Sequence, residues 1–245
     1  AAGVPARCRV RRNVLVAGVG EACQARLAAA RVLVVGAGGL GSPVLLYLTA
    51  AGIGTIGICD SDVVEVSNLQ RQLLHGEGDV GDPKPDSAVR HLSGLNSSVH
   101  FERYGHVTRE WLDEHGREWD LIVECTDSFD SKYLVADYCA DSGVPLVWGT
   151  VVSMAFQVSV FWSAAPAPVP SLTLRSLHPV KPAPGTTPAS PKVGVLGPVV
   201  GQAGTAMATE AIKLLVGFGE PLIGRVLMTD SATQRADVLT FAPWD

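Results

Sequence analysis

The chain has 245 residues, 47% of them hydrophobic, and its formal net charge at pH 7 is −5. This length and composition allow one substantial hydrophobic core. Acidic residues outnumber basic ones, which does not suggest a basic face that would bind nucleic acid or an anionic lipid surface. No apolar run reaches the ~20 residues that a membrane-spanning helix needs. We therefore expect neither a nucleic-acid partner nor an association with a membrane.

The cysteines and the N-terminal residues indicate a cellular compartment. The five cysteines stand at positions 8, 23, 59, 125 and 139 and form no CxxC pair. Scattered cysteines of this kind are typical of reduced thiols rather than of a disulfide framework. The N-terminal stretch contains basic residues, but its apolar part is too short and mixed for a signal or transit peptide. The sequence therefore predicts a cytoplasmic protein.

Strands and helices alternate through the first part of the chain. Residues 1–30 carry a basic patch and then EACQARLAAA, which has the composition of a helix. The alternation that follows predicts a parallel, doubly wound sheet of the Rossmann type. In chain order we expect a strand over 31–36, a helix over 42–51, a strand over 54–60, a helix over 85–96, a strand over 98–104, a helix over 108–116, a strand over 119–127, a helix over 129–143 and a strand over 144–150.

The pattern changes after Thr150. A strand over 154–162 precedes residues 163–192, which hold eight of the 16 prolines and predict a mobile or extended crossover loop without a packed core. A long helix over 197–219 and an antiparallel hairpin over 224–241 are expected after it. We therefore expect one α/β domain with a mostly parallel sheet and C-terminal antiparallel strands. Its parts would be an N-terminal arm and helix (1–30), a nucleotide-binding core (31–162), the crossover loop (163–192), and a C-terminal helix and hairpin (193–245).

A glycine-rich turn joins the first expected strand to the first helix of this core. In VLVVGAGGLG (32–41) four apolar residues run directly into glycines. Such glycines permit a tight turn, a close approach of phosphate to the backbone, and close packing of helix on strand. The N-terminus of the following helix attracts an anion. We interpret the loop as a nucleotide-binding turn formed by Gly36, Gly38, Gly39 and Gly41.

The side chains beyond the loop indicate which nucleotide it holds. Asp60 lies roughly twenty residues further on, where an acidic residue bonds ribose in dinucleotide sites, and alone it would favour NAD. However, Arg71 and Lys84 follow, and two cations neutralise charge on a leaving pyrophosphate, whereas NAD usually needs only backbone N–H groups. Asp127, at the expected end of the fourth strand, can hold Mg²⁺ against phosphate oxygens. The residues therefore favour ATP.

Seven segments together point to a known family. They are GAGGLGSP, the Asp60–Asp62 pair, SNLQRQLLH, DVGDPK, CTDSF, EAIKLL and GEPLIGR. The chain resembles the MoeB/ThiF/HesA adenylyltransferases, relatives of the ubiquitin-activating enzymes, over about residues 9–241. The resemblance implies that Asp60 holds the ribose and that Asn68, Arg71 and Lys84 hold the triphosphate. It further implies that Asp127 is the Mg²⁺ ligand.

The resemblance extends to an arginine near the N-terminus. Arg12, in RVRRN, is similar to the family arginine that reaches into the partner protomer's site, which implies a homodimer; Val10 stands where the family usually has tyrosine. The implied catalytic residues are Arg71, Lys84, Asp127 and Arg12. The implied nucleotide-binding residues are Gly36, Gly38, Gly39, Gly41, Asp60, Asp62, Ser67, Asn68, Arg71, Gln72, Lys84, Asp127 and Ser128.

The reaction implied by the resemblance is adenylylation of a carrier protein. The C-terminal glycine carboxylate of a small ubiquitin-like sulfur carrier, ending in Gly-Gly, would attack the α-phosphate of ATP. The products would be an acyl-adenylate and pyrophosphate, as the activation step for a thiocarboxylate. A carboxylate is ionised at neutral pH and needs no general base, so positioning and charge neutralisation are the protein's task.

The chain departs from its relatives at two sulfur sites. Many members carry two CxxC pairs for structural zinc; Thr173–Ser176 stands at the first, and no cysteine follows Cys139. Tetrahedral zinc needs four N or S ligands, so no zinc is expected. Ser190 stands where relatives often have a cysteine that forms a covalent link with the carrier, and a serine is a poor nucleophile without a base. We therefore expect a separate sulfur donor.

Other functions remain open at this stage. The chain could adenylylate a different carboxylate or a tRNA base, although the acidic balance speaks against tRNA. It could also be a non-catalytic dimer partner that keeps the fold, but such a scaffold has no need of Arg71, Lys84 and Asp127 together. An NAD-linked oxidoreductase is the least favoured. The six histidines, at positions 75, 91, 100, 106, 115 and 178, have no ligand spacing and are interpreted as surface or packing residues.

Overall fold

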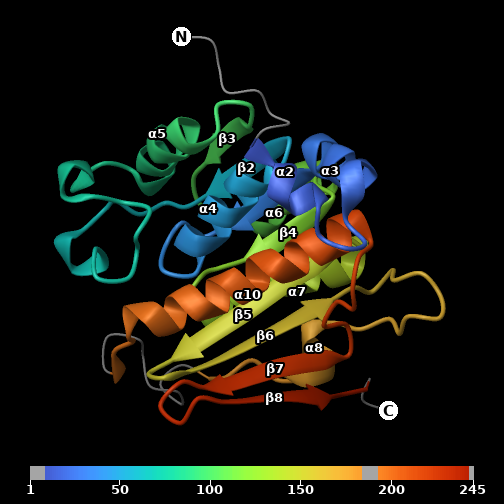
Figure 1. Ribbon diagram of the computed structural model, residues 1–245. Helices are drawn as coiled ribbons and strands as arrows, with labels where there is room; N and C mark the ends of the chain where they lie inside the picture. The colour runs from blue at the N-terminus through green and yellow to red at the C-terminus, as the bar shows by residue number, and fades with distance from the viewer. Residues whose placement is uncertain (1–8, 184–192, 243–245) are drawn as a thin grey trace.

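The computed structural model describes residues 9–183 and 193–242 of the chain (Figure 1). A single eight-stranded sheet runs through these residues, with the strand order β3-β2-β1-β4-β5-β6-β7-β8. The strands are β1 (Arg31–Val35), β2 (Thr55–Cys59), β3 (His100–Tyr104), β4 (Leu121–Glu124), β5 (Leu146–Val152), β6 (Ala155–Phe161), β7 (Arg225–Asp230) and β8 (Arg235–Thr240).

The sheet changes from parallel to antiparallel pairing at β5. The strands from β3 to β5 in sheet order pair in parallel, with Val34 opposite Ile58 on one side and Val123 on the other. From β5 onward each pair is antiparallel. This confirms the predicted fold class. Because β1 is followed in the chain by β2 on one side, and β4 returns on the other, the sheet has a topological switch beside β1, where such folds bind ligands.

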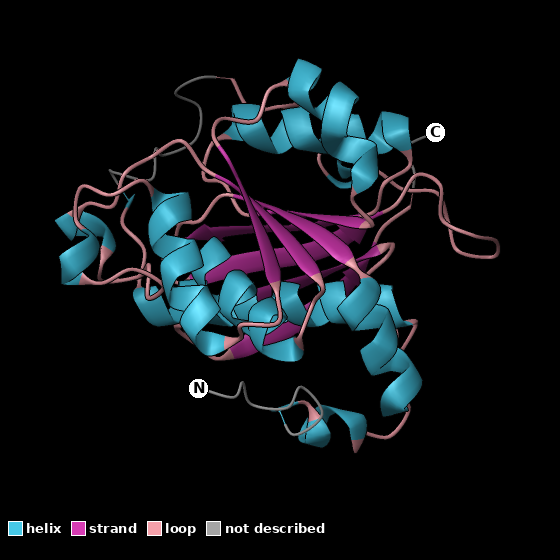
Figure 2. Cartoon of the chain, turned by 90° about the horizontal axis from the view of Figure 1, so that it is seen from above, coloured by secondary structure: helices cyan, strands magenta, loops and turns pink. Residues whose placement is uncertain are grey.

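Helices cover both faces of the sheet, as Figure 2 shows from above. One layer contains α3, α4, α5 and α10, and the opposite layer contains α6, α7 and α8. Two sequence signals that end or begin these helices are confirmed: Thr108 caps α6 by accepting a hydrogen bond from Trp111 N–H at 3.2 Å, and Gly143 ends α7 with φ 80°. The described helices are α2 (Arg11–Val14), α3 (Gly20–Ala29), α4 (Gly41–Ala51), α5 (Lys84–Leu95), α6 (Arg109–His115), α7 (Phe129–Ser142), α8 (Leu174–Leu177) and α10 (Gly197–Val216).

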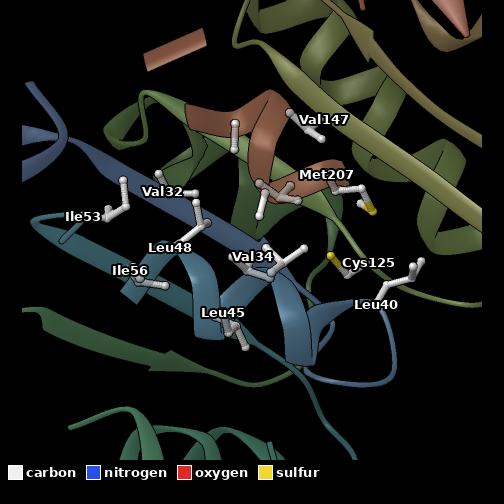
Figure 3. Close-up of a cluster of buried hydrophobic side chains, with 14 of the residues drawn as sticks. Val32, Val34, Leu40, Leu45, Leu48, Ile53, Ile56, Cys125, Val147 and Met207 are labelled. Carbon is white, nitrogen blue, oxygen red and sulfur yellow. The ribbon is translucent and has the colours of Figure 1, made fainter. Parts of the chain in front are cut away.

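The larger core lies between the sheet and the layer that contains α4 and α10. Figure 3 shows part of it, where Val34 of β1, Leu45 and Leu48 of α4, and Met207 of α10 lie together. Each of these four side chains is fully buried. Since β1 is covered by helices on both faces, its residues from Val32 to Val35 are apolar without alternation, as the sequence predicted. This packing fixes the position of the glycine turn that follows β1.

The proline-rich crossover segment is more ordered than predicted. Composition suggested no packed core over 163–192, but Leu172 and Leu174 are 1% and 2% exposed, and Leu174 begins the short helix α8. Leu174 belongs to the second core together with Phe161 of β6. The prediction was wrong for this part because two leucines between the prolines find an apolar surface to cover. Ser190 lies outside the described residues.

Two strand ends also differ from the predictions. β4 ends at Glu124, three residues before Asp127, so that Asp127 lies in the turn after the strand rather than at its last residue. β5 continues to Val152, and the residues beyond Thr150 pair with β6.

Among the described helices none combines the length and apolar character that crossing a membrane requires. The polar stretch over 61–83 contains two short 3₁₀ helices, Val66–Asn68 and Glu77–Asp79.

Candidate active site

A cavity of about 460 Å³ opens at the carboxyl ends of β1, β2, β4 and β5. It lies at the topological switch beside β1, the place where α/β sheets bind ligands. Ten of the thirteen residues predicted to bind nucleotide line it. They are Gly36, Gly38, Gly39, Asp60, Asp62, Arg71, Gln72, Lys84, Asp127 and Ser128.

The three remaining residues, Gly41, Ser67 and Asn68, are not part of the cavity lining. Gly41 begins α4, and a Cβ atom there would lie only 1.9 Å from the carbonyl oxygen of Gly36, so this glycine closes the turn. Asn68 is buried; its amide nitrogen donates to the Ser67 hydroxyl at 3.3 Å, and that hydroxyl donates to the Glu65 carboxylate at 3.1 Å. Ser67 and Asn68 therefore shape the loop that carries Arg71 rather than the cavity itself.

The first glycine of the turn is required by its backbone. Gly36 has φ of +100°, a conformation that disfavours a side chain, and a Cβ atom there would lie 2.9 Å from the Cys125 backbone. The turn therefore passes tightly between the ends of β1 and β4. It leads into α4, an 11-residue helix whose positive dipole end lies beside the cavity and favours an anionic ligand.

Asp60 connects the end of β2 to this turn. Its Oδ2 accepts a hydrogen bond from the Ala37 N–H at 2.8 Å, and its Oδ1 accepts one from the Asp62 N–H at 2.8 Å. Each carboxylate oxygen can accept a second hydrogen bond. Asp60 is therefore held in place by backbone donors while it can still accept hydrogen bonds from the hydroxyls of a ribose.

Lys84 is a buried cation of the site. It is 5% exposed, and its Nζ lies 2.8 Å from Oδ2 of Asp62, whose side chain is 70% exposed. Lys84 is the first residue of α5, and its backbone N–H donates to the Asp62 carbonyl at 3.0 Å. The start of α5 therefore fixes the lysine beside the cavity, with a surface carboxylate as its partner.

Arg71 and Gln72 add donors and an acceptor to the same wall. The Arg71 guanidinium donates to the Ser67 carbonyl at 3.1 Å. Gln72 is 4% exposed, and its Oε1 is buried without a hydrogen-bond partner. A buried polar atom without a partner is costly, so the cavity offers an acceptor that a ligand donor would satisfy.

Asp127 and Ser128 occupy the turn between β4 and α7. Ser128 caps α7 by accepting a hydrogen bond from the Ser131 N–H at 3.0 Å. Asp127 lies exposed at the cavity, and its hard carboxylate oxygens suit Mg²⁺. In the described ranges, no three His, Cys, Asp or Glu side chains gather into a metal site. Mg²⁺ bound with a nucleotide needs only one or two carboxylates, because phosphate oxygens and water supply the rest. The residues present fit such an ion.

Arg12 stands apart from the other predicted residues. It lies exposed on α2, outside the lining of its own chain's cavity. The structure does not bring it to the side chains with which the family resemblance groups it. Its role stays a prediction about a second copy of the chain.

The sequence did not single out a buried lysine and a buried glutamate beside Asp127. Lys132 of α7 lines the cavity and is 3% exposed, and its Nζ lies 2.6 Å from Oε2 of Glu124, which is fully buried. The only signal in the sequence is a glutamate that ends an apolar strand and a lysine early in the following helix. Neither residue type marks burial, so this pair needed the tertiary structure.

His75 is a packing residue that supports the glycine turn. Its Nε2 lies 2.9 Å from the Ala37 carbonyl oxygen and its Nδ1 lies 2.8 Å from the Ser87 hydroxyl. Burial lowers the pKa of His75 below its ordinary value, although the hydrogen bond to Ala37 opposes that shift. The neutral imidazole therefore donates from Nε2 and accepts at Nδ1.

Three cysteines, Cys59, Cys125 and Cys139, are buried, and burial disfavours the thiolate form of each. Burial, and secondarily the charge of Asp60, raises the pKa of Cys59 to about 12. Burial likewise raises the pKa of Cys125 and of Cys139 well above the ordinary value. Because the thiolate is the nucleophilic form, these three thiols do not serve as nucleophiles at neutral pH.

Comparison with solved structures supports the fold alone. The chain superposes on a crystal structure of Escherichia coli MccB with MccA-N7isoASN with a TM-score of 0.84 and 22% sequence identity, covering 99% of this chain and 74% of that one. It also superposes on PaaA with a TM-score of 0.80 and 22% identity, covering 96% of this chain and 74% of PaaA.

Sequence comparison finds closer relatives. The chain is 43% identical over 224 residues to the probable adenylyltransferase/sulfurtransferase MoeZ of Mycobacterium tuberculosis, covering 91% of this chain but 57% of MoeZ. It thus spans a little over half the length of that relative. It is 42% identical to the sulfur carrier protein adenylyltransferase of Thermus thermophilus, and 41% identical to the SAMP-activating enzyme E1 of Haloferax volcanii. These alignments cover 91% of this chain, and 83% and 81% of the two relatives.

A family model covers nearly the whole chain. The model of the ThiF family matches residues 10–243, a range that includes every residue of the cavity. With the relatives above, this match settles the identity of the domain. The chain belongs to the ThiF family.

Proposed function

We propose that this protein adenylylates the C-terminal glycine carboxylate of a small ubiquitin-like sulfur-carrier protein. The observation that carries the proposal is the gathering of Arg71, Lys84 and Asp127 with the glycine turn around one cavity in a ThiF-family chain. Residues of these kinds can promote the formation of an acyl-adenylate, and this reaction needs no nucleophilic side chain from the protein. The names of the relatives from Thermus thermophilus and Haloferax volcanii support the same reaction class.

The chemistry requires charge neutralisation more than proton transfer. A carboxylate oxygen of the carrier attacks the α-phosphorus of ATP, the bond from that phosphorus to the bridging oxygen breaks, and pyrophosphate leaves with the electron pair. The carboxylate is already ionised at neutral pH, so no general base is needed. Preorganised cations that face the developing charge lower the barrier, and Arg71 and Lys84 are two cations of the cavity wall.

Several predicted residues of the cavity have a role in the proposal. Asp60 would accept hydrogen bonds from the ribose hydroxyls, with its position fixed by Ala37 N–H at 2.8 Å. Lys84 would exchange its contact with Asp62 for a phosphate oxygen. The glycine turn and the start of α4 would hold phosphate by backbone N–H groups. Asp127 would hold Mg²⁺, and the bound ion would neutralise charge on the triphosphate.

The partner and the assembly follow from the family. The carrier would end in Gly-Gly, as the family resemblance implies. The enzyme would work as a cytoplasmic homodimer in which Arg12 of one protomer reaches the cavity of the other, consistent with its distance from its own cavity's lining. It would work without structural zinc, since Thr173–Ser176 stands in place of the family's first CxxC pair.

Sulfur transfer would be left to a separate donor. The described cysteines are buried, and three have pKa values raised by that burial. Ser190, in place of the family cysteine, would form no covalent bond with the carrier. A carrier adduct that survives denaturation and is released by a thiol would contradict this part of the proposal.

The test is carrier-dependent exchange of labelled pyrophosphate into ATP by the purified protein. The carriers tried are the ubiquitin-like proteins with a C-terminal Gly-Gly that the same genome encodes. We expect exchange with at least one of them and none when its terminal glycine is removed. Exchange with none of them, or exchange that persists without the terminal glycine, would contradict the proposal. Tight binding of NADH without exchange would revive the oxidoreductase alternative.

A further inference from the structure

Below the cavity, Glu124 and Lys132 form an ion pair that is closed to water. Lys132 Nζ lies 2.6 Å from Glu124 Oε2 and 2.7 Å from the Gly149 carbonyl oxygen, and the two side chains are 4% and 0% exposed. Removing two charges from water is expensive, and well-packed apolar residues often replace such a pair without loss of stability. Stability alone therefore does not account for an ion pair in this position.

The second oxygen of Glu124 holds the turn that carries Asp127. Glu124 Oε1 accepts a hydrogen bond from the Thr126 N–H at 2.8 Å and another from the Thr126 hydroxyl. On the other side of Asp127, the hydroxyl of Ser128 caps α7. The backbone of Asp127 is therefore fixed at both neighbouring residues, while its carboxylate stays exposed at the cavity.

Lys132 joins this turn to the next strand. Gly149, which accepts its second hydrogen bond, lies in β5 immediately before Thr150, and Thr150 lines the cavity. The ammonium group thus links the end of β4, the first turns of α7 and the wall formed by β5. Lys84 differs, because its carboxylate partner Asp62 is 70% exposed and can be displaced by a ligand.

We propose that Glu124 and Lys132 are positioning residues that hold the Asp127 carboxylate where it meets the Mg²⁺–ATP complex, and that Lys132 does not bind the triphosphate. The inference rests on the proposed function, because it assigns Asp127 to that complex. Two short contacts, to a carboxylate and to a carbonyl, already engage Lys132. Residues that orient a metal ligand typically contribute about 10- to 100-fold to metal affinity.

The test measures binding of a non-hydrolysable ATP analogue, AMPCPP, by calorimetry in Mg²⁺ and in EDTA. For Lys132→Met we expect affinity in Mg²⁺ to fall by about tenfold or more, and affinity in EDTA to change by less than about twofold. The matched control is Lys181→Met. Lys181 is an exposed lysine, and its partner Asp130 lies on α7, the helix that carries Lys132. The control variant should bind like the wild type under both conditions. An equal loss in Mg²⁺ and EDTA for Lys132→Met would show direct phosphate contact and overturn the inference.

A double-mutant cycle separates positioning from a general loss of structure. If Lys132 acts through Asp127, then Lys132→Met should cause no further loss of Mg²⁺-dependent affinity in an Asp127→Asn background. Additive losses would overturn the inference. A wild-type protein that binds no AMPCPP in either condition would instead overturn the proposed function, and it is recognised before any variant is made.

A milder pair of variants covers the case in which Lys132→Met does not fold. Thr126→Val keeps the shape of the side chain but removes the hydroxyl that donates to Glu124, whereas Thr126→Ser restores it. We expect the valine variant to lose affinity only in Mg²⁺, by about threefold or more, and the serine variant to return within about twofold of wild type. Equal affinities for the two variants in Mg²⁺ would overturn the inference.

Discussion

The ammonium nitrogen of Lys84 lies 2.8 Å from a carboxylate oxygen of Asp62, so this buried cation of the cavity is paired with an exposed partner. Asp62 is mostly exposed and returns to water when it leaves Lys84, whereas the buried lysine needs another anion in its place. A triphosphate, with several negative charges, can therefore take the place of Asp62 at low cost. The pair keeps the Lys84 side chain oriented before the nucleotide arrives.

Lys84→Met should lower carrier-dependent ATP–pyrophosphate exchange by more than about a hundredfold, because a preorganised cation is removed from the leaving group. Initial rates at saturating ATP measure the effect, and a thermal unfolding midpoint checks the fold. Arg103→Met is the control. Arg103 of β3 pairs at the surface with Asp86, which lies on α5, the helix that Lys84 begins. Comparable rates for these two variants would remove Lys84 from the site.

Asp127→Ala and Arg71→Ala should each nearly abolish exchange while leaving the fold intact. Asp127 is exposed and Arg71 only partly buried, so neither truncation opens a cavity in the core. Each removes a charge that faces the triphosphate in the proposed complex. Circular dichroism and the exchange rate measure both parts of the prediction. Near-normal exchange in either variant would refute its assignment.

Arg12→Ala should be rescued by a second inactive variant if Arg12 works across a dimer. In an equal mixture of Arg12→Ala and Asp127→Ala chains, half of the dimers are mixed, and each mixed dimer has one complete site. Exchange should therefore return to about a quarter of the wild-type rate after the subunits are exchanged. A mixture as inactive as its components would place Arg12 outside the partner's site.

Because His75 is buried, we expect the protein to lose stability in mild acid. Burial lowers the pKa of His75 in the folded protein below the ordinary value of 6.5, so the unfolded chain takes up the proton first. The contribution of His75 to the free energy of unfolding should therefore be fully present above about pH 7. It should be lost as the pH falls below about 6.5. The variant His75→Gln, which can still donate to Ala37, should show a smaller difference between urea unfolding at about pH 7.5 and pH 5.5.

His178 provides the internal comparison for this experiment. Burial also lowers its pKa, so it contributes a pH dependence of the same sign. The slope that remains in His75→Gln is therefore expected to be smaller rather than zero. An unchanged slope would mean that His75 titrates alike in the folded and unfolded chains.

Most of the parallel sheet could be predicted from the sequence because its signals are local. Apolar runs such as VLVV and LIVE fit strands buried on both faces, and Gly143 or Thr108 mark helix ends through their own backbone and side-chain preferences. The crossover segment was less predictable. Leu172 and Leu174 are both buried, and Leu174 belongs to a core that includes Val35 of β1 and Tyr133 of α7, which lie far away in the chain.

The sequence by itself determined the kind of site: a glycine turn, an aspartate after the second strand, two cations and a second aspartate, in an order that resembles one family. Only the tertiary structure decided which of these residues meet. It places Lys84 and Asp127 around one cavity and leaves Ser67, Asn68 and Arg12 outside the lining of that cavity. It also revealed the pair of Glu124 and Lys132, because burial arises from segments far apart in the chain, and no local pattern of residues encodes it.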